Sequence, residues 1–353
     1  MAKPIIGGIQ QIGIGNPDIY KTWAWYRKAF HIDIPIFDEA ATASLMLPYT
    51  GGQPHDRHAV LAMSMRGGGG IEIWQYTSRI PVAPEHQISI GDLGICIASV
   101  KSDDITKTYH HLNSLSCNVL CEPIKRPDGA EHFYVKDPNE NILDVVPSQD
   151  WFTKSKVNTG GIYGCTIGVS DMDKSLPFYK NILGYDTVIF DQTDVCEDFA
   201  CLPGGSEIYR RVLLSHSQPR RGPFSEWIGN SEIELIQAID RIPRKIFADR
   251  YWGDLGYIHL CYDVQGMAAM KSLCASHGHP FTVDSSDSFD MGEAAGHFSY
   301  IEDPDGTLIE FVEAHKIPIL KKIGWYLDLR KRDAETPLAR WMLRALALNR
   351  EKA

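Results

Sequence analysis

An internal duplication constrains the fold of this 353-residue chain more than any other feature. Ser78–Pro81 reads SRIP and leads to a GDLG motif at Gly91–Gly94, while Asp240–Pro243 reads DRIP and leads, at the same spacing, to GDLG at Gly253–Gly256. Other matching segments follow the same order in both halves: Ile71–Gln75 with Ile233–Gln237, and His132–Val146 with His297–Val312. Ordered matches of this kind identify a repeat. We therefore predict two copies of one unit, residues 1–150 and 158–314.

Each copy is predicted to contain two similar modules. It opens with a strand rich in β-branched residues, and Asn16 or Ser170 then offers a helix N-cap before an amphipathic segment. Alternating strands follow, and the strand after each GDLG motif starts a second cycle that closes in a hairpin with an Asp-Pro turn. The pattern predicts an α+β fold of four βαβββ modules, roughly 80 residues each, which we number one to four along the chain.

Residues 315–353 form a different kind of segment, a C-terminal tail rich in Lys and Arg. Its apolar residues have helical spacing and predict a basic amphipathic helix; they are Leu338, Trp341, Met342, Ala345 and Leu348. Such a helix would pack across the body or at a subunit interface, and contact with an anionic membrane is the alternative.

Composition excludes several classes of protein. The 44% hydrophobic and 23% charged residues are ordinary for a globular protein. A net charge of −10 argues against nucleic acid as a partner. The N-terminus has no apolar signal segment, and no stretch reaches the length of a membrane span. Eight scattered Cys without a CxxC motif predict reduced core thiols and a cytoplasmic location. The oligomeric state stays open, a homo-oligomer included.

Two segments carry a family resemblance: Gly168–Tyr185 (GVSDMDKSLPFYKNILGY) and Tyr300–Phe311 (YIEDPDGTLIEF). They are similar to the vicinal oxygen chelate superfamily, which includes glyoxalase I, bleomycin resistance proteins and extradiol dioxygenases. The resemblance covers residues 5–314. It implies that modules pair into cup-shaped sheets, and that the first and last strands of each module offer ligands to a metal ion. One fold of this kind serves many reactions, so the resemblance is weak evidence for any one of them.

The resemblance assigns two ligand positions to each module. In chain order these positions are Gln11 and Glu72, Ile95 and Asp144, Gly164 and Glu234, and His259 and Glu310. Ile95 and Gly164 have no ligating side chain. Gln10 would take the role of Gln11 after a one-residue shift in register.

Module pairing decides which ligands meet. Pairing in chain order gives two sites that each lack one ligand. Pairing of module one with module four, and of two with three, gives one complete site of Gln11, Glu72, His259 and Glu310, which resembles the ligand set of glyoxalase I, and one site that cannot function. We favour the second arrangement.

This ligand set predicts a metal-dependent enzyme for a small-molecule substrate with vicinal oxygens. One imidazole, one amide and two carboxylates suit a single divalent ion, such as Zn, Ni, Co, Mn or Fe. The predicted reaction is glyoxalase-type proton transfer through an enolate, of the isomerase or lyase class, with Glu310 and Glu72 as proton carriers and Tyr300 as a further catalytic residue. The alternatives are an Fe(II)-dependent extradiol ring-cleaving dioxygenase, whose His-His-Glu triad is incomplete here, and a metal-free binding or resistance protein.

Two further groups have an open role. His132 and His297 occupy equivalent positions in the two copies, and a structural role at a strand edge is the simpler interpretation. The segment 209–224 contains Arg210, Arg211, Arg220 and Arg221. These residues would either bind an anionic substrate group or lie in a solvated loop.

Overall fold

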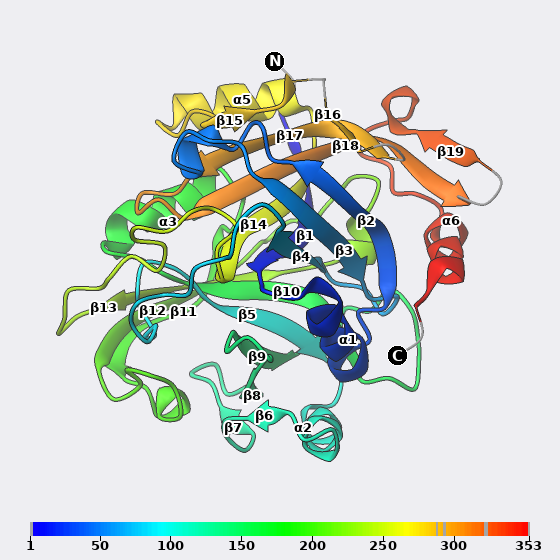
Figure 1. The fold of residues 1–353 in the computed structure, drawn as a ribbon. Coiled ribbons are helices and arrows are strands. Elements are labelled where there is room, and N and C mark those ends of the chain that lie inside the picture. The colour runs from blue at the N-terminus through cyan, green and yellow to red at the C-terminus, as the bar shows by residue number, and fades with distance from the viewer. Residues whose placement is uncertain (1–2, 287–288, 292–293, 321–323, 352–353) are drawn as a thin grey trace.

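The computed structural model describes residues 3–286, 289–291, 294–320 and 324–351, and these contain two mixed β-sheets with short helices (Figure 1). The first sheet has the strand order β15-β17-β18-β14-β1-β4-β3-β2, with β16 paired to β17 and β19 to β18. Its strands are β1 (Ile5–Gly15), β2 (Ile34–Thr42), β3 (Asp56–Met63), β4 (Gly70–Tyr76), β14 (Gly256–Gln265), β15 (Val283–Asp284), β16 (Phe289–Met291), β17 (Ala294–Glu302), β18 (Leu308–Leu320) and β19 (Trp325–Asp328).

The second sheet has the order β11-β12-β13-β10-β5-β9-β8-β6, with β7 paired to β8. Its strands are β5 (Gly94–Ser102), β6 (Asn118–Val119), β7 (Ile124–Lys125), β8 (Glu131–Lys136), β9 (Ile142–Pro147), β10 (Thr159–Gly168), β11 (Thr187–Val195), β12 (Ile208–Ser215) and β13 (Glu232–Ala238). The helices are α1 (Ile19–Phe30), α2 (Ile105–Ser114), α3 (Met172–Asn181), α4 (Ser225–Ile228), α5 (Met267–Ser276) and α6 (Arg340–Ala345), with 3-10 turns η1 (Leu47–Tyr49), η2 (Glu197–Phe199), η5 (Leu329–Lys331) and η6 (Leu346–Asn349).

This topology confirms the α+β fold of four modules and the favoured pairing. The first sheet joins module one to module four through the antiparallel pair β1–β14, and the second joins module two to module three through β5–β10. In Figure 1 the blue N-terminal strand β1 and the yellow strand β14 belong to the same sheet, and orange β18 follows on the other side of β14. The division into 1–150, 158–314 and 315–353 stays a prediction about sequence units, since each of the first two units contributes to both sheets.

The repeated motifs form reciprocal ties between the two copies. Arg79 of SRIP donates from Nη1 to Asp254 Oδ1 of the second GDLG motif at 2.7 Å, and Arg241 of DRIP donates to Asp92 Oδ1 of the first at 2.6 Å. Both aspartates are buried. Because a buried carboxylate requires a partner, these crossed pairs favour the association of the two copies.

A second pair of ties explains the repeated Phe/Trp-Tyr and Asp-Pro segments. Tyr26 of α1 donates to Asp137 Oδ2 at 2.9 Å, and Tyr179 of α3 donates to Asp303 Oδ2 at 2.8 Å. Each bond joins the helix of one module to the Asp-Pro turn of the next. Most of the buried apolar side chains of the four modules form one contiguous core cluster. These repeated residues therefore build the fold, and function has to be sought in other side chains.

The helix starts differ slightly from those predicted. Asp18 and Asp171 are the N-caps of α1 and α3, so the prediction of Asn16 and Ser170 was wrong by one or two residues. Asn16 instead donates from Nδ2 to the backbone oxygen of Trp74 at 3.0 Å. None of the helices in the described part of the chain has the length and hydropathy of a membrane span.

The C-terminal tail contains less helix than predicted. It begins as the continuation of β18, returns through β19, and only then forms the short helix α6. Leu338, Leu343 and Leu346 are buried against Trp227 and other residues of a separate apolar cluster. Trp341 and Leu348, which the helical pattern assigned to the apolar face, are 57% and 72% exposed. The tail therefore packs on the body of the protein through a partly different set of side chains, because Leu338 and Met342 of the predicted set also contact this cluster.

Candidate metal centre

Four predicted ligands meet on adjacent strands of the first sheet. Glu310 lies on β18, His259 on β14, Gln11 on β1 and Glu72 on β4, and these strands are neighbours in that order. We call the four residues the quartet. All are buried, with His259 fully inaccessible. The two C-terminal members reach the two N-terminal ones only because β1 pairs with β14.

The quartet is compact, and three of its polar atoms have no hydrogen-bond partner among the described residues. His259 Nε2 lies 3.2 Å from Glu72 Oε2 and 3.2 Å from Glu310 Oε2. Gln11 donates from Nε2 to Glu72 Oε2 at 3.1 Å. The unpartnered atoms are Gln11 Oε1, His259 Nε2 and Glu310 Oε2. Buried polar atoms are normally satisfied, so three orphans in one place indicate that a further group belongs there.

A divalent cation fits this arrangement. One ligand atom from each of Glu72, His259 and Glu310 lies within 4.8 Å of the others. Amide oxygen, imidazole nitrogen and two carboxylates are donors for borderline or hard cations. The buried Glu72/His259/Glu310 group could therefore hold a metal ion, and Gln11 Oε1 is the remaining donor.

The charges of the quartet perturb one another. Burial alone would lower the pKa of His259, but the carboxylates of Glu310 and Glu72 outweigh it and raise this pKa above its ordinary value. Burial, with the negative charge of Glu72, raises the pKa of Glu310 despite the opposing effect of His259. Two ionised carboxylates around one imidazole leave the quartet with a net negative charge. A bound cation would neutralise this charge.

Local backbone features position the quartet. Gly13 of β1 pairs with both Glu72 and His259, and a Cβ at Gly13 would lie 2.4 Å from His259 Cε1. Only glycine therefore leaves room for the imidazole ring. A register shift between Ile9 and Gln11 is a β-bulge, and it allows both Gln10 and Gln11 to line the same cavity. Gln10 Oε1 faces the Cys261 thiol at 3.7 Å, while Gln11 contacts Glu72.

Aromatic residues surround the quartet. Tyr300 of β17 pairs with Glu310 in register, and its Oη lies 3.5 Å from His259 Nδ1. The Trp252 ring stacks on the His259 ring at a centroid distance of 6.1 Å and an interplanar angle of 12°. A cavity of about 370 Å³ opens beside Gln11, Glu72 and Glu310. The quartet thus forms one end of a pocket that can admit a small molecule.

The second sheet has a charged cluster in the corresponding place, which sequence reasoning missed. We call His132, Asp144, Asp198, Arg211 and Glu234 the arginine cluster. Fully buried Arg211 donates to Asp198 Oδ1 at 2.8 Å and to Glu234 Oε1 at 2.9 Å, and His132 Nδ1 lies 2.8 Å from Asp144 Oδ1. Arg211 is on strand β12, so the prediction of a solvated or substrate-binding loop was wrong for this residue. Its guanidinium supplies positive charge from within the chain.

Two predicted equivalences need correction. Cys261 pairs with Glu310 and Ser99 with Asp144, so the counterpart of His259 is Ile97, two residues beyond Ile95. Tyr300 pairs with Glu310 as Tyr134 does with Asp144, which makes Phe298 the counterpart of His132. His297 instead faces Asp284, with Nε2 2.6 Å from its Oδ1.

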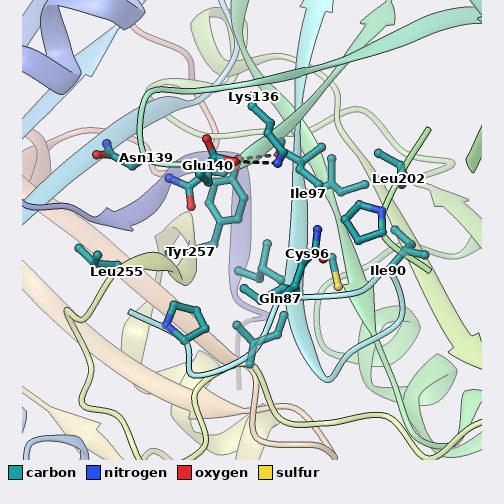
Figure 2. A pocket seen from close by; sticks show the side chains of 18 of the residues that line it. Gln87, Ile90, Cys96, Ile97, Lys136, Asn139, Glu140, Leu202, Leu255 and Tyr257 are labelled. Carbon is teal, nitrogen blue, oxygen red and sulfur yellow. Dashed lines mark hydrogen bonds and ion pairs between the residues drawn. The ribbon is translucent and has the colours of Figure 1, made fainter. Parts of the chain in front are cut away.

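The second sheet contains no ligand set of its own at these positions. A Cβ at Gly164, the counterpart of Gln11, would lie 1.9 Å from the Glu232 carbonyl oxygen, so no larger side chain fits there. Ile97 lines a different cavity of about 450 Å³, together with Ile90, Leu202 and Tyr257 (Figure 2). Lys136 and Glu140 form an ion pair at 2.7 Å beside this cavity. The cavity is mainly apolar, in contrast to the quartet.

Comparison with known proteins places the fold. No protein-family model matches this chain, and no curated protein matches it. Among solved structures, glyoxalase I from Zea mays is similar with a TM-score of 0.54 and 12% identity, over 87% of this chain and 92% of that one. A "putative dioxygenase" from Bacillus subtilis is similar with a TM-score of 0.55 and 16% identity, over 88% and 86%. At such low identity the likeness concerns the fold.

Proposed function

We propose that this chain, which has the fold of the vicinal oxygen chelate superfamily, is a glyoxalase-type lyase or isomerase that uses one divalent metal ion. The observation that carries the proposal is the convergence of Gln11, Glu72, His259 and Glu310, with three unpartnered polar atoms at the centre. The two carboxylates would neutralise the ion, and the neutral amide of Gln11 adds no further negative charge. When bound, the ion would supply Lewis acidity to vicinal oxygens of a substrate.

The protein's own residues then account for proton transfer. Glu310 Oε2 has no hydrogen-bond partner among the described residues and lines the cavity, so it can take a proton from the carbon next to a carbonyl group. Glu72 also lines the cavity and can return the proton. Tyr300, at the edge of His259, orients the imidazole and the bound substrate.

The proposal is tested by metal analysis and by proton exchange. Protein purified without a tag or chelator is expected to contain about one divalent ion per chain. In D2O it should catalyse exchange of the α-protons of 2-hydroxyacetophenone, followed by NMR. Replacement of Glu310 by Gln should abolish exchange, with Arg210→Gln as an unrelated control. Exchange that persists in Glu310→Gln would contradict the assigned role.

A ring-cleaving dioxygenase is the second candidate. It is favoured by the likeness to the "putative dioxygenase" and by the contact between Tyr300 and His259. Such enzymes resemble this site in His259 and Glu310 but have histidine where Gln11 stands. Stoichiometric iron together with oxygen uptake on catechol would establish this alternative. A protein that binds ligands equally well with and without chelator would instead be the metal-free binding protein.

A further inference from the structure

We propose that the substrate of this site is a small aromatic compound that carries a carboxylate at the end away from the metal, and that Arg57 binds this carboxylate. The inference rests on the proposed function, because it requires the vicinal oxygens to lie at the quartet. It adds the shape and the charge of the substrate. Three features of the cavity carry it.

The first feature is the wall of the cavity between the quartet and its far end. Phe37, Trp74, Trp252, Phe298 and Tyr300 all line it. Trp74 and Trp252 pack edge to face at 4.7 Å, which fixes two broad apolar surfaces. Aromatic rings prefer the faces and edges of other rings, so a planar aromatic body is the complementary ligand. A volume of about 370 Å³ limits that ligand to a compact molecule.

The second feature is the placement of Arg57. It lies on β3, and strand alternation puts it on the same face of the sheet as Ala59 and Leu61. These two residues pair with Trp74 and Glu72 of β4, so Arg57 shares the face of the sheet that contains the quartet. The side chain is half-buried and lines the cavity. Its Nη1 donates to the backbone oxygen of Glu39 at 2.9 Å, which holds the guanidinium beside edge strand β2, on the side of β3 away from the quartet.

The third feature is charge. No carboxylate in the described part of the chain lies within ion-pair distance of Arg57, and a single backbone bond leaves most of its donors unused. Glu39 also lines this end of the cavity, but it has an interaction partner of its own. A guanidinium with free donors beside an aromatic wall matches a carboxylate, which it can bind through two parallel hydrogen bonds.

The register gives the length of the ligand. Glu39 pairs with Ala59, and Glu72 pairs with Leu61, two residues further along β3. Two residues span about 7 Å along a strand, and β2 and β4 are separated by two strand spacings, about 9.6 Å. The backbone position of Glu39, which anchors Arg57, and that of Glu72 are therefore roughly 12 Å apart. A single aromatic ring with a group at each end can bridge this gap together with its contacts to the guanidinium and the ion.

The test uses three hydroxamates as probes, because a hydroxamate presents two adjacent oxygens to any divalent ion. Manganese-loaded full-length protein is titrated calorimetrically with benzohydroxamate, its 4-carboxy derivative and its 4-carbamoyl derivative. We expect the carboxylate to bind at least about tenfold more tightly than the amide. Arg57→Gln should abolish this preference while binding plain benzohydroxamate within about threefold of the wild-type protein. Arg210→Gln, which changes a half-buried arginine of the second sheet, is the matched control and should retain this preference.

The outcomes separate the two proposals. Metal uptake and binding of plain benzohydroxamate test the proposed function, whereas the ratio between the carboxylate and the amide tests Arg57. Equal affinities in a protein that binds metal and benzohydroxamate would overturn the inference and leave the function standing. A preference that survives Arg57→Gln but is lost in Glu39→Gln would also overturn it. Absence of metal uptake would end both proposals.

Discussion

The two sheets use the same modules and the same strand pairing, yet their centres differ in charge balance. In the first sheet, two carboxylates face one imidazole and three polar atoms lack a hydrogen-bond partner, against two such atoms, His132 Nε2 and Arg211 Nη2, in the arginine cluster. In the second, Arg211 lies between Asp198 and Glu234, and His132 binds Asp144. One centre could hold a cation from outside the chain, whereas the other has its cation built in. The difference teaches that a duplicated fold can keep its architecture in both sheets while only one of them keeps a candidate metal site.

The packing around the two centres differs in the same way as their charge. The quartet adjoins a cavity, and Gly13 leaves room for the His259 ring. At the equivalent position the second sheet has Thr166, whose hydroxyl donates to Glu234 Oε2 at 3.1 Å and so adds to the arginine cluster. Satisfied buried networks stabilise a fold, whereas unsatisfied ones are costly unless they serve a ligand. We therefore expect substitutions in the second sheet to affect stability and substitutions in the first to affect binding.

The largest expected effect is on the arginine cluster. Arg211→Met leaves Asp198 and Glu234 as buried charges without compensation, and should lower the free energy of unfolding by about 3–5 kcal/mol. Urea denaturation measures this change in the free energy of unfolding. The neighbouring Arg210, half-buried on the same strand and paired with Asp173 and Asp191, is the control, and Arg210→Met should change stability by about 1 kcal/mol or less. Equal effects of the two substitutions would refute the contrast between the centres.

The next effect concerns the paired positions Glu310 and Asp144. Glu310→Ala should weaken metal binding by about 100-fold or more, because even outer-shell partners of metal ligands contribute 10–100-fold. Asp144→Ala should leave metal affinity unchanged but lower stability, since it removes the partner of His132. Competition with a fluorescent chelator measures affinity, and thermal melting measures stability. Loss of metal in Asp144→Ala would show that the second sheet also contributes a ligand.

Much of this arrangement could be predicted from sequence, and the exceptions have physical causes. The quartet was found because polar residues stand out within apolar strands such as Ile71–Gln75. The equivalence of His132 and His297 was wrong because the second copy has one more residue before its Asp-Pro turn, and a one-residue slip turns a side chain to the opposite face of a strand. Counting from the GDLG motifs would have given Ile97 in place of Ile95.

Other features cannot be read from one sequence. Module pairing stayed open because either pairing satisfies the same local patterns, and only contacts such as that between Arg79 and Asp254 distinguish them. Arg210 and Arg211 are adjacent in sequence, and alternation predicts that they face opposite sides of a strand. It does not predict which side is buried, since this depends on the partner that β12 finds in β13.

A smaller effect on metal binding is expected at Gly13. Gly13→Ala places a Cβ 2.4 Å from Cε1 of the His259 ring, closer than van der Waals contact allows, so the ring must be displaced. We expect metal affinity to fall by about 10–100-fold, comparable to the loss of an orienting partner. The counterpart substitution Thr166→Ala should leave metal affinity unchanged. Chelator competition on both variants provides the measurement, and an unaffected Gly13→Ala would show that His259 does not bind the metal.

The smallest expected effect is the change in the free energy of unfolding per pH unit that comes from His132. Burial alone would lower its pKa, but the carboxylates of Asp144 and Asp198 raise it to about 10, against about 6.5 for an unfolded histidine. The folded state therefore binds the proton more tightly, and this stabilisation is complete below about pH 6.5 and is lost as the pH rises to about 10. The slope for one proton is at most about 1.4 kcal/mol per pH unit.

In His132→Gln, urea denaturation between pH 7 and 10 should show a flatter decline of the free energy of unfolding than in the wild-type protein. The same profile measured with Glu310→Gln should keep the wild-type slope, because that residue belongs to the other centre; a flattened profile there would mean that the two centres are coupled.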